Sequence, residues 1–233
     1  MPPDAKRAQG APKDSKGCLD PFAAENYFYL HCTPDRVAKF LAHAKLYEMS
    51  LGLPGHFAEA GVFKGASFCR FRKLGRLFHP DHTRRFIGFD IFGKFPPAEY
   101  GPDKQVLDIL WASDGDTSIT RQALLLLLKD QGLADNVDLV EGDIRQTLPH
   151  YLKEHQQISF AIVNIDLDLY EATAAALENL FPLVVRGGIV ILDDYEGFPG
   201  AKRAVDEYLA THKRQERLLK LCFARSPSYL IKE

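Results

Sequence analysis

Apolar positions in this sequence alternate between short unbroken runs, typical of strands, and the wider spacing of amphipathic helices. Strand-like runs occur at 56–61, 84–90, 136–143, 158–168 and 187–194. Helix-like segments follow at 67–78, 119–133, 171–184 and 201–212. The run at 158–168 is nearly all apolar, which predicts a strand buried on both faces. The alternation predicts a doubly wound α/β fold with a mostly parallel sheet and right-handed crossovers.

Two further segments complete this prediction. Residues 217–224 and 229–233 flank the turn-like sequence RSPS and predict a C-terminal antiparallel hairpin. The five leucines at 124–128 are too apolar for an exposed helix face, so we expect them to be buried.

The first 53 residues differ from the rest. Residues 1–19 are mostly polar, glycine, proline and alanine, which predicts a disordered leader. Residues 20–53 predict a helical extension, in which Thr33 and Pro34 are suited to a helix cap and first turn. This extension is either a lid, an oligomer contact or an ordinary packing helix. We expect residues 20–233 to form a single domain.

Composition excludes several classes of protein. The chain has 233 residues, 46% of them hydrophobic, and a net charge of −2 from 29 basic and 31 acidic residues. This balance gives no electrostatic case for nucleic acid. No apolar run is long enough to span a membrane, and the N-terminus lacks an apolar signal core. Four scattered cysteines without a CxxC pair are typical of a reducing cytoplasm.

Acidic residues follow every predicted parallel strand. They are Glu59, Asp90, Glu141, Asp143, Asp166, Asp168, Asp193 and Asp194. Ligands of doubly wound sheets bind outside the carboxyl ends of the strands, where these side chains meet. The alternative is a set of solvated loop acids and helix caps. An acidic rim without a phosphate-binding glycine motif disfavours nucleotides and favours a ligand with hydroxyls and positive charge, such as S-adenosylmethionine.

The first strand–helix turn is suited to that cofactor. Gly61 and Gly65 allow close approach of a ligand to the backbone. Glu59 can reach the amino acid end, and Asp90 can hold ribose hydroxyls. The segment EGDI at 141–144 lies where the adenine would fall.

The segments NIDLDLYE and ILDDYEG predict a cation site. Asp166 and Asp193 lie one helical crossover apart, at the ends of strands that we expect to be neighbours, and Asp194 adds a third carboxylate. Oxygen ligands without His or Cys favour Mg²⁺, Mn²⁺ or Ca²⁺ over Zn²⁺. The alternative is an aspartate-rich loop without an ion.

Four segments carry a resemblance to a known family: FAEAGVFKGAS, FIGFDIFGKFP, VEGDIRQTLP and the long stretch from NIDLDLYE to AVDEYL. Over about residues 25–215 the chain resembles the macrocin O-methyltransferase (TylF) family, which methylates sugar hydroxyls of natural products. The resemblance implies a Rossmann-like class I methyltransferase fold with a seven-stranded sheet. It also implies S-adenosylmethionine as methyl donor, Mg²⁺ dependence, and a homodimer or tetramer.

The resemblance also implies roles for particular residues. Asp166, Asp193 and Asp194 would be metal ligands, and Asp168 the catalytic base. The predicted cofactor pocket contains Glu59, Gly61, Gly65, Ser67, Asp90, Asp143 and Ile144. The chain departs from the family pattern after Asp90, where Ile91 replaces the usual serine. Asp168 has an alternative role as the cap of a helix beginning near Tyr170.

Residues 92–120 contain Phe92, Phe95, Tyr100 and Trp111. We expect this insertion to be a substrate-covering lid, or alternatively an aromatic-anchored surface loop. The leading hypothesis is a sugar or polyol O-methyltransferase. The alternatives are a catechol-type or other small-molecule O-methyltransferase and a non-catalytic binding protein of the same fold.

Overall fold

The computed structural model describes residues 20–78 and 83–233. Its strands form one sheet with the order β3-β2-β1-β4-β5-β7-β6. The strands are β1 (His56–Ala60), β2 (Phe86–Asp90), β3 (Val137–Glu141), β4 (Phe160–Ile165), β5 (Val184–Leu192), β6 (Leu219–Lys220) and β7 (Ser228–Ile231). β1 to β5 pair in parallel, and β7 runs antiparallel to β5 and β6. The predicted sheet with its C-terminal antiparallel hairpin is confirmed.

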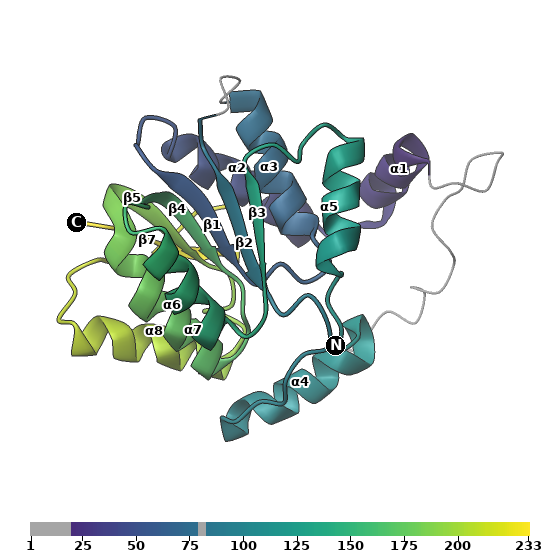
Figure 1. The fold of residues 1–233 in the computed structure, drawn as a ribbon. Coiled ribbons are helices and arrows are strands. Elements are labelled where there is room, and N and C mark those ends of the chain that lie inside the picture. Colours follow the sequence, from purple (N-terminus) through teal and green to yellow (C-terminus); the bar gives the residue numbers. More distant parts are fainter. Residues whose placement is uncertain (1–19, 79–82) are drawn as a thin grey trace.

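Helices cover both faces of this sheet (Figure 1). They are α1 (Pro21–His31), α2 (Pro34–Met49), α3 (Ala66–Phe78), α4 (Gly101–Asp114), α5 (Arg121–Asp130), α6 (Ile144–Glu154), α7 (Tyr170–Leu180) and α8 (Pro199–Thr211), with a short 3₁₀ helix at Phe181–Leu183. α6, α7 and α8 pack on one face, and α2, α3 and α5 on the other. α4 extends away from the sheet beyond the carboxyl ends of the strands.

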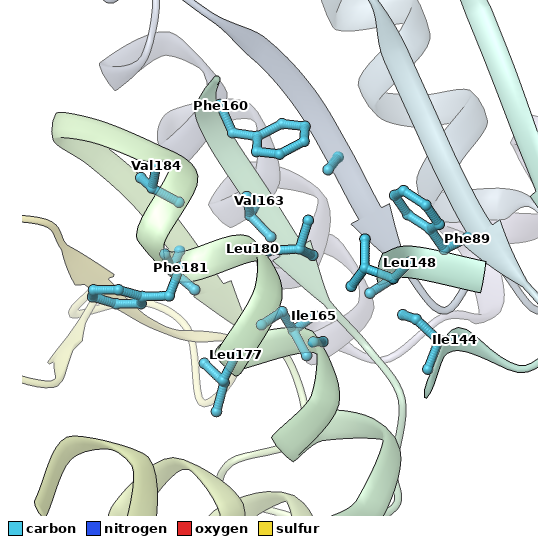
Figure 2. Packing of buried hydrophobic residues seen from close by; sticks show 14 of the residues in the cluster. Phe89, Ile144, Leu148, Phe160, Val163, Ile165, Leu177, Leu180, Phe181 and Val184 are labelled. Carbon is cyan, nitrogen blue, oxygen red and sulfur yellow. The ribbon is translucent and has the colours of Figure 1, made fainter. Parts of the chain in front are cut away.

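Two apolar clusters hold the layers together because side chains alternate between the faces of each strand. On β4, Ile162 joins the cluster beneath α2, α3 and α5, whereas Val163 joins the cluster beneath α6, α7 and α8. Figure 2 shows the second cluster, in which Phe89 and Val163 of the strands lie near Leu148 of α6 and Leu180 of α7. Burial of each such side chain contributes about 1.5–3 kcal/mol. The strands thereby hold their carboxyl ends at one rigid edge.

The N-terminal extension forms α1 and α2. Thr33 and Pro34 occupy the predicted cap and first helical positions of α2. α2 buries Leu46 and Tyr47 against the sheet, so this half is a packing helix. α1 contains no buried residue in the described part of the chain. The predicted leader at 1–19 lies outside the described residues.

The structure differs from the prediction in helices α4 and α6, which were not predicted, and in the exposure of the leucines of α5. The apolar spacing does not reveal α4 or α6, since α6 carries an internal Pro149 and α4 is largely exposed. Within α5, Leu124 and Leu128 are fully buried, but Leu126 and Leu127 are about half exposed. A helix on a sheet buries one side only, so a run of five leucines must place some in solvent.

Within residues 20–78 and 83–233, none of the helices has both the length and the apolar character that crossing a bilayer requires.

Candidate active site

Three aspartates meet at the carboxyl ends of β4 and β5. One carboxylate oxygen from each of Asp166, Asp168 and Asp194 lies within 4.8 Å of the others. β4 and β5 pair in parallel with Ile165 opposite Leu192, so the loops that follow them begin side by side. The structure therefore brings two of the predicted metal ligands together with the predicted base.

Asp168 lies in the turn between β4 and α7 rather than on the strand. Its φ of 61° is in the left-handed region, which costs on the order of 1–3 kcal/mol for a non-glycine residue. Its backbone N–H donates to the Asp194 carboxylate at 2.9 Å, which holds the turn in place. The N-cap position of α7 is Leu169, so the alternative role of Asp168 as the helix cap is not what the structure shows.

The three carboxyl groups raise one another's pKa values. Burial, together with the charge of Asp166, raises the pKa of Asp168 to about 7. Burial and the neighbouring carboxylates also raise the pKa values of Asp166 and Asp194 well above the ordinary range. A pKa near neutrality suits Asp168 to accept a proton during catalysis.

Asp193 is held by α2. Lys39 Nζ lies 2.5 Å from Asp193 Oδ2 and 3.8 Å from an oxygen of Asp166. His43 Nε2 lies 3.8 Å from Asp193 Oδ1. Burial alone would raise the pKa of Asp193, but His43 and Lys39 hold that pKa at about 2. Asp193 is therefore ionised and does not join the three-carboxylate cluster.

These residues fit a hard dication. Burial and the neighbouring carboxylates raise the pKa values of Asp166, Asp168 and Asp194, a cost that a bound dication would remove. Asp193 Oδ1 is buried and has no hydrogen-bond partner among the described residues. Oxygen-only donors are the ligands that Mg²⁺ prefers. The grouped oxygens of Asp166, Asp168 and Asp194 could hold such an ion, and the role of Asp193 as a ligand stays a prediction, because Lys39 and His43 lie against its carboxylate.

A second polar site lies at the end of β1. Glu59 is fully buried, and its Oε1 accepts a hydrogen bond of 2.8 Å from Asn164. Burial raises the pKa of Glu59 to about 8, although hydrogen bonds from Ser67 and Asn164 lower it. Glu59 Oε2 and Asn164 Oδ1 are buried acceptors without a partner within the described residues. Two such acceptors side by side fit a cationic donor such as the ammonium of S-adenosylmethionine.

The predicted glycine turn connects this site with the aspartates. Gly61 has a φ of +91°, and a Cβ there would lie 1.7 Å from the Asp166 carbonyl oxygen. Gly65, with a φ of +84°, donates its N–H to Val62 O and opens α3 at Ala66. Glycine is required at both positions, and at Gly61 the reason is contact with the aspartate-bearing loop.

The carboxylate of Asp90 is used by the backbone. One oxygen accepts the N–H groups of Val62 and Phe63, at 2.8 and 2.9 Å, and the other accepts that of Phe92 at 2.8 Å. Asp90 is 5% exposed. It thus ties the turn after β1 to the turn after β2, and its contact with a ribose stays a prediction.

Asp143 and Ile144 lie across the sheet, beyond β3. Asp143 is the N-cap of α6, and the hydrogen bonds and charge of Arg145 lower its pKa. Ile144 is 5% exposed and packs in the cluster of Figure 2. Both side chains are engaged in structural contacts, and their predicted place in the cofactor pocket stays a prediction.

A known protein family covers most of this chain. Residues 36–223 match the macrocin O-methyltransferase (TylF) family. The chain belongs to this family. The resemblance inferred from the four sequence segments is confirmed.

Curated relatives of this TylF family chain carry the names of O-methyltransferases. An 8-demethyl-8-(2,3-dimethoxy-alpha-L-rhamnosyl)-tetracenomycin-C 4'-O-methyltransferase of Streptomyces olivaceus is 34% identical over 67% of this chain. A demethyldecarbamoylnovobiocin O-methyltransferase of Streptomyces niveus is 31% identical over 72% of it. The matches span 59% and 63% of the lengths of these two relatives.

Solved structures place the TylF family chain among class I methyltransferases. The calicheamicin methyltransferase CalS11 superposes with a TM-score of 0.74 at 29% identity, over 91% of this chain and 86% of that one. The O-methyltransferase NovP gives 0.73 at 28% identity, over 84% and 80%. The predicted class I methyltransferase fold is confirmed.

Lys39, His43 and Asn164 belong to the site but were not predicted from the sequence. Lys39 and His43 are one helical turn apart on α2, a spacing that places both on one face. Asn164 is a polar residue within the apolar run of β4, and that interruption was the available signal. Lys39 and His43 gave no signal, because nothing in the sequence shows that their helix packs beside Asp193.

Proposed function

We propose that this chain transfers a methyl group from S-adenosylmethionine to a hydroxyl group of a sugar-containing natural product, with the help of Mg²⁺. The observation that carries the proposal is the convergence of Asp166, Asp168 and Asp194 beside the buried acceptors of Glu59 and Asn164. The name of the Streptomyces olivaceus relative, whose substrate carries a rhamnosyl group, supports a sugar hydroxyl as the acceptor.

The chain's own residues would bind and orient the cofactor. Glu59 and Asn164 would accept hydrogen bonds from the ammonium of its methionine part, which would satisfy both unpartnered oxygens. The turn from Gly61 to Gly65 packs against the Asp166 carbonyl and Leu124, which would fix its position beside the cofactor. Fixed placement of donor and acceptor contributes much of the rate, since effective molarities of well-held pairs start at roughly 10⁵ M.

Asp166, Asp193 and Asp194 would hold the metal ion. When bound, Mg²⁺ supplies Lewis-acid polarisation and orientation of the acceptor hydroxyl. The partly buried carboxyl groups of these residues would also line the site of the acceptor hydroxyl. They would disfavour an anionic group next to the reacting oxygen.

Asp168 would accept the proton. As the acceptor oxygen forms its bond to the methyl carbon, the carbon–sulfur bond breaks and its electron pair stays on sulfur. The hydroxyl proton passes to the Asp168 carboxylate, leaving the methyl ether and S-adenosylhomocysteine. General-base help of this kind is typically worth about 10²–10⁴-fold in rate.

The test is release of S-adenosylhomocysteine from S-adenosylmethionine with a panel of glycosylated natural products and nucleotide sugars, with Mg²⁺ and with EDTA. We expect Mg²⁺-dependent turnover that Asp168→Asn lowers about 10²-fold or more. The matched control is Asp130→Asn at the exposed end of α5. Undiminished turnover in EDTA would remove the metal from the proposal, and failure of S-adenosylmethionine to bind in calorimetry would refute it altogether.

We also propose a cytoplasmic location and a homodimer or tetramer. The free thiols of Cys32, Cys69 and Cys222 support a reducing compartment. Exposed Phe22, Tyr29 and Leu30 on α1 support self-association. Light scattering on the purified chain gives the oligomer mass, and a monomer at micromolar concentration would contradict this part.

A further inference from the structure

Asp103, in the first turn of α4, is a carboxylate from the insertion that lies beneath two other helices. Asp103 is 1% exposed to solvent. Its Oδ2 accepts the backbone N–H of Tyr170 at 2.9 Å, and its Oδ1 accepts that of Gly200 at 2.9 Å. One side chain thus bonds to two segments that lie 67 and 97 positions further along the chain.

Both acceptors of Asp103 face helix N-termini. Tyr170 is the first residue of α7, and Gly200 is the second of α8. The cap residues Leu169 and Phe198 make no side-chain capping bond in the part of the chain that the structure describes. Asp103 supplies both caps instead. The positive ends of two helix dipoles also attract this carboxylate.

The fit is close. A Cβ on Gly200 would lie 2.0 Å from Asp103 Oδ2 and 2.4 Å from Oδ1, so only glycine leaves room for the carboxylate. The glycine of α8 is thereby explained by contact rather than by backbone conformation.

A second layer of contacts holds the same junction. The rings of Tyr100 and Tyr170 are 5.5 Å apart, and the Arg203 guanidinium lies over both, at 5.1 and 5.2 Å. Glu207 accepts hydrogen bonds from the Tyr170 hydroxyl and from Arg203. The beginning of α4 is therefore fastened to α7 and α8 rather than free to swing.

The two helices that Asp103 joins carry the loops of the candidate active site. Asp168 lies two positions before Tyr170, and Asp194 lies six before Gly200. The Asp194 carbonyl accepts the N–H groups of Gly197 and Phe198, so its loop is folded directly onto the start of α8. Displacement of either helix N-terminus would change the separation of the two carboxylates.

We propose that Asp103 is a positioning residue for methyl transfer: it sets the distance between the loops that carry Asp168 and Asp194. This inference rests on the proposed function, in which those aspartates accept the proton and hold the ion. It assigns the beginning of the insertion a fixed place beside the acidic cluster. Any movement of the insertion as a lid is confined to residues beyond this junction.

Three variants test the proposal. Asp103→Asn keeps one acceptor and loses the charge, Asp103→Ala loses both bonds, and Gly200→Ala displaces the carboxylate without altering it. The matched control is Asp108→Asn, an exposed aspartate on the same helix. The measurements are Mn²⁺ affinity by electron paramagnetic resonance, S-adenosylmethionine affinity by calorimetry, kcat and KM, and the unfolding temperature.

We expect Asp103→Asn and Gly200→Ala to weaken Mn²⁺ binding or lower kcat by about 10–100-fold, the usual cost of losing a residue that supports metal ligands. S-adenosylmethionine affinity should stay near that of the wild type, because Glu59 and Asn164 lie within strands β1 and β4, whereas the hydrogen bonds of Asp103 go to the first turns of α7 and α8. Asp103→Ala should have the larger effect.

A purely structural role would lower the unfolding temperature and leave Mn²⁺ affinity and kcat of the folded fraction unchanged, and that result would overturn the proposal. If Asp103→Ala does not fold, Asp103→Asn and Gly200→Ala decide. If the wild type binds no Mn²⁺, the metal part of the proposed function fails, and the positioning role is then judged on kcat alone. If the wild type binds Mn²⁺ but methylates nothing, Mn²⁺ affinity decides.

Discussion

At the scale of single residues, Lys39 compensates part of the negative charge of the acidic cluster. Its ammonium lies within salt-bridge distance of Asp193 and Asp166, and their charges raise its pKa despite burial. Lys39 is therefore charged at neutral pH. Because a dication would be attracted by the same carboxylates, Lys39 and the metal compete for the same negative charge.

The first prediction follows from this competition. Lys39→Met should bind Mg²⁺ and Mn²⁺ at least about tenfold more tightly than the wild type, a difference of about 1.4 kcal/mol. Isothermal titration with each metal alone measures it. The matched control is Lys45→Met, an exposed lysine of the same helix that pairs with Glu48. Equal or weaker metal binding by Lys39→Met would show that the lysine assists the site instead.

Glu59 makes the stability of the protein depend on pH. Folding raises its pKa from 4.5 to about 8, so the folded chain binds this proton more tightly than the unfolded chain does. Its contribution therefore lowers the free energy of unfolding as pH rises from 4.5 to about 8, and the loss persists above.

Glu59→Gln has no such proton to lose. We expect the unfolding temperature of Glu59→Gln to rise relative to that of the wild type as pH rises from about 5 to about 9. The reason is that the variant buries no charge at this position at any pH. Calorimetric scans without cofactor measure it, with Glu25→Gln on the exposed helix α1 as control. A difference that does not change with pH would mean that Glu59 is not the group responsible.

At the scale of elements, the sheet and the helices α3, α5, α7 and α8 were predictable, whereas α4 and α6 were not. The apolar runs are clearest for β2 and β4, which are buried along their whole length, whereas β3 at the edge of the sheet is only partly buried. The pattern misses α4, which buries only Asp103 and Leu107, since a helix with so little buried surface has no strong apolar stripe. The convergence of Asp166 with Asp194 follows from parallel pairing. The partners Lys39, Asn164 and Asp103 depend on how separate elements pack.

Asp90 shows how one side chain joins two elements. Asp90→Ala removes three hydrogen bonds to backbone N–H groups of the turns after β1 and β2. We expect a loss of about 1–3 kcal/mol in S-adenosylmethionine binding, because both turns border the predicted pocket. Calorimetric titration measures it, and Asp138→Ala on the neighbouring strand β3 is the control. An unchanged dissociation constant would place the cofactor elsewhere.

For the whole molecule, the apolar clusters on the two faces of the sheet fix the strands so firmly that repelling carboxylates can be held at one edge. The folded chain bears this repulsion, and the unfolded chain, in which the aspartates separate, does not. Burial and mutual charge raise the pKa values of Asp166 and Asp194, which is the signature of that cost. A bound dication would remove it only in the folded state.

Mg²⁺ should therefore raise the unfolding temperature of the entire domain. An ion present at 100 times its dissociation constant stabilises the folded state by about 2.7 kcal/mol, provided that the unfolded chain does not bind it. For a chain of this length that corresponds to roughly 5–10 °C. Differential scanning fluorimetry with MgCl₂, against NaCl of equal ionic strength, measures the shift. Asp166→Asn should abolish it, whereas Asp130→Asn on α5 should preserve it; an equal response to both salts would mean that the acidic edge screens charge without binding an ion.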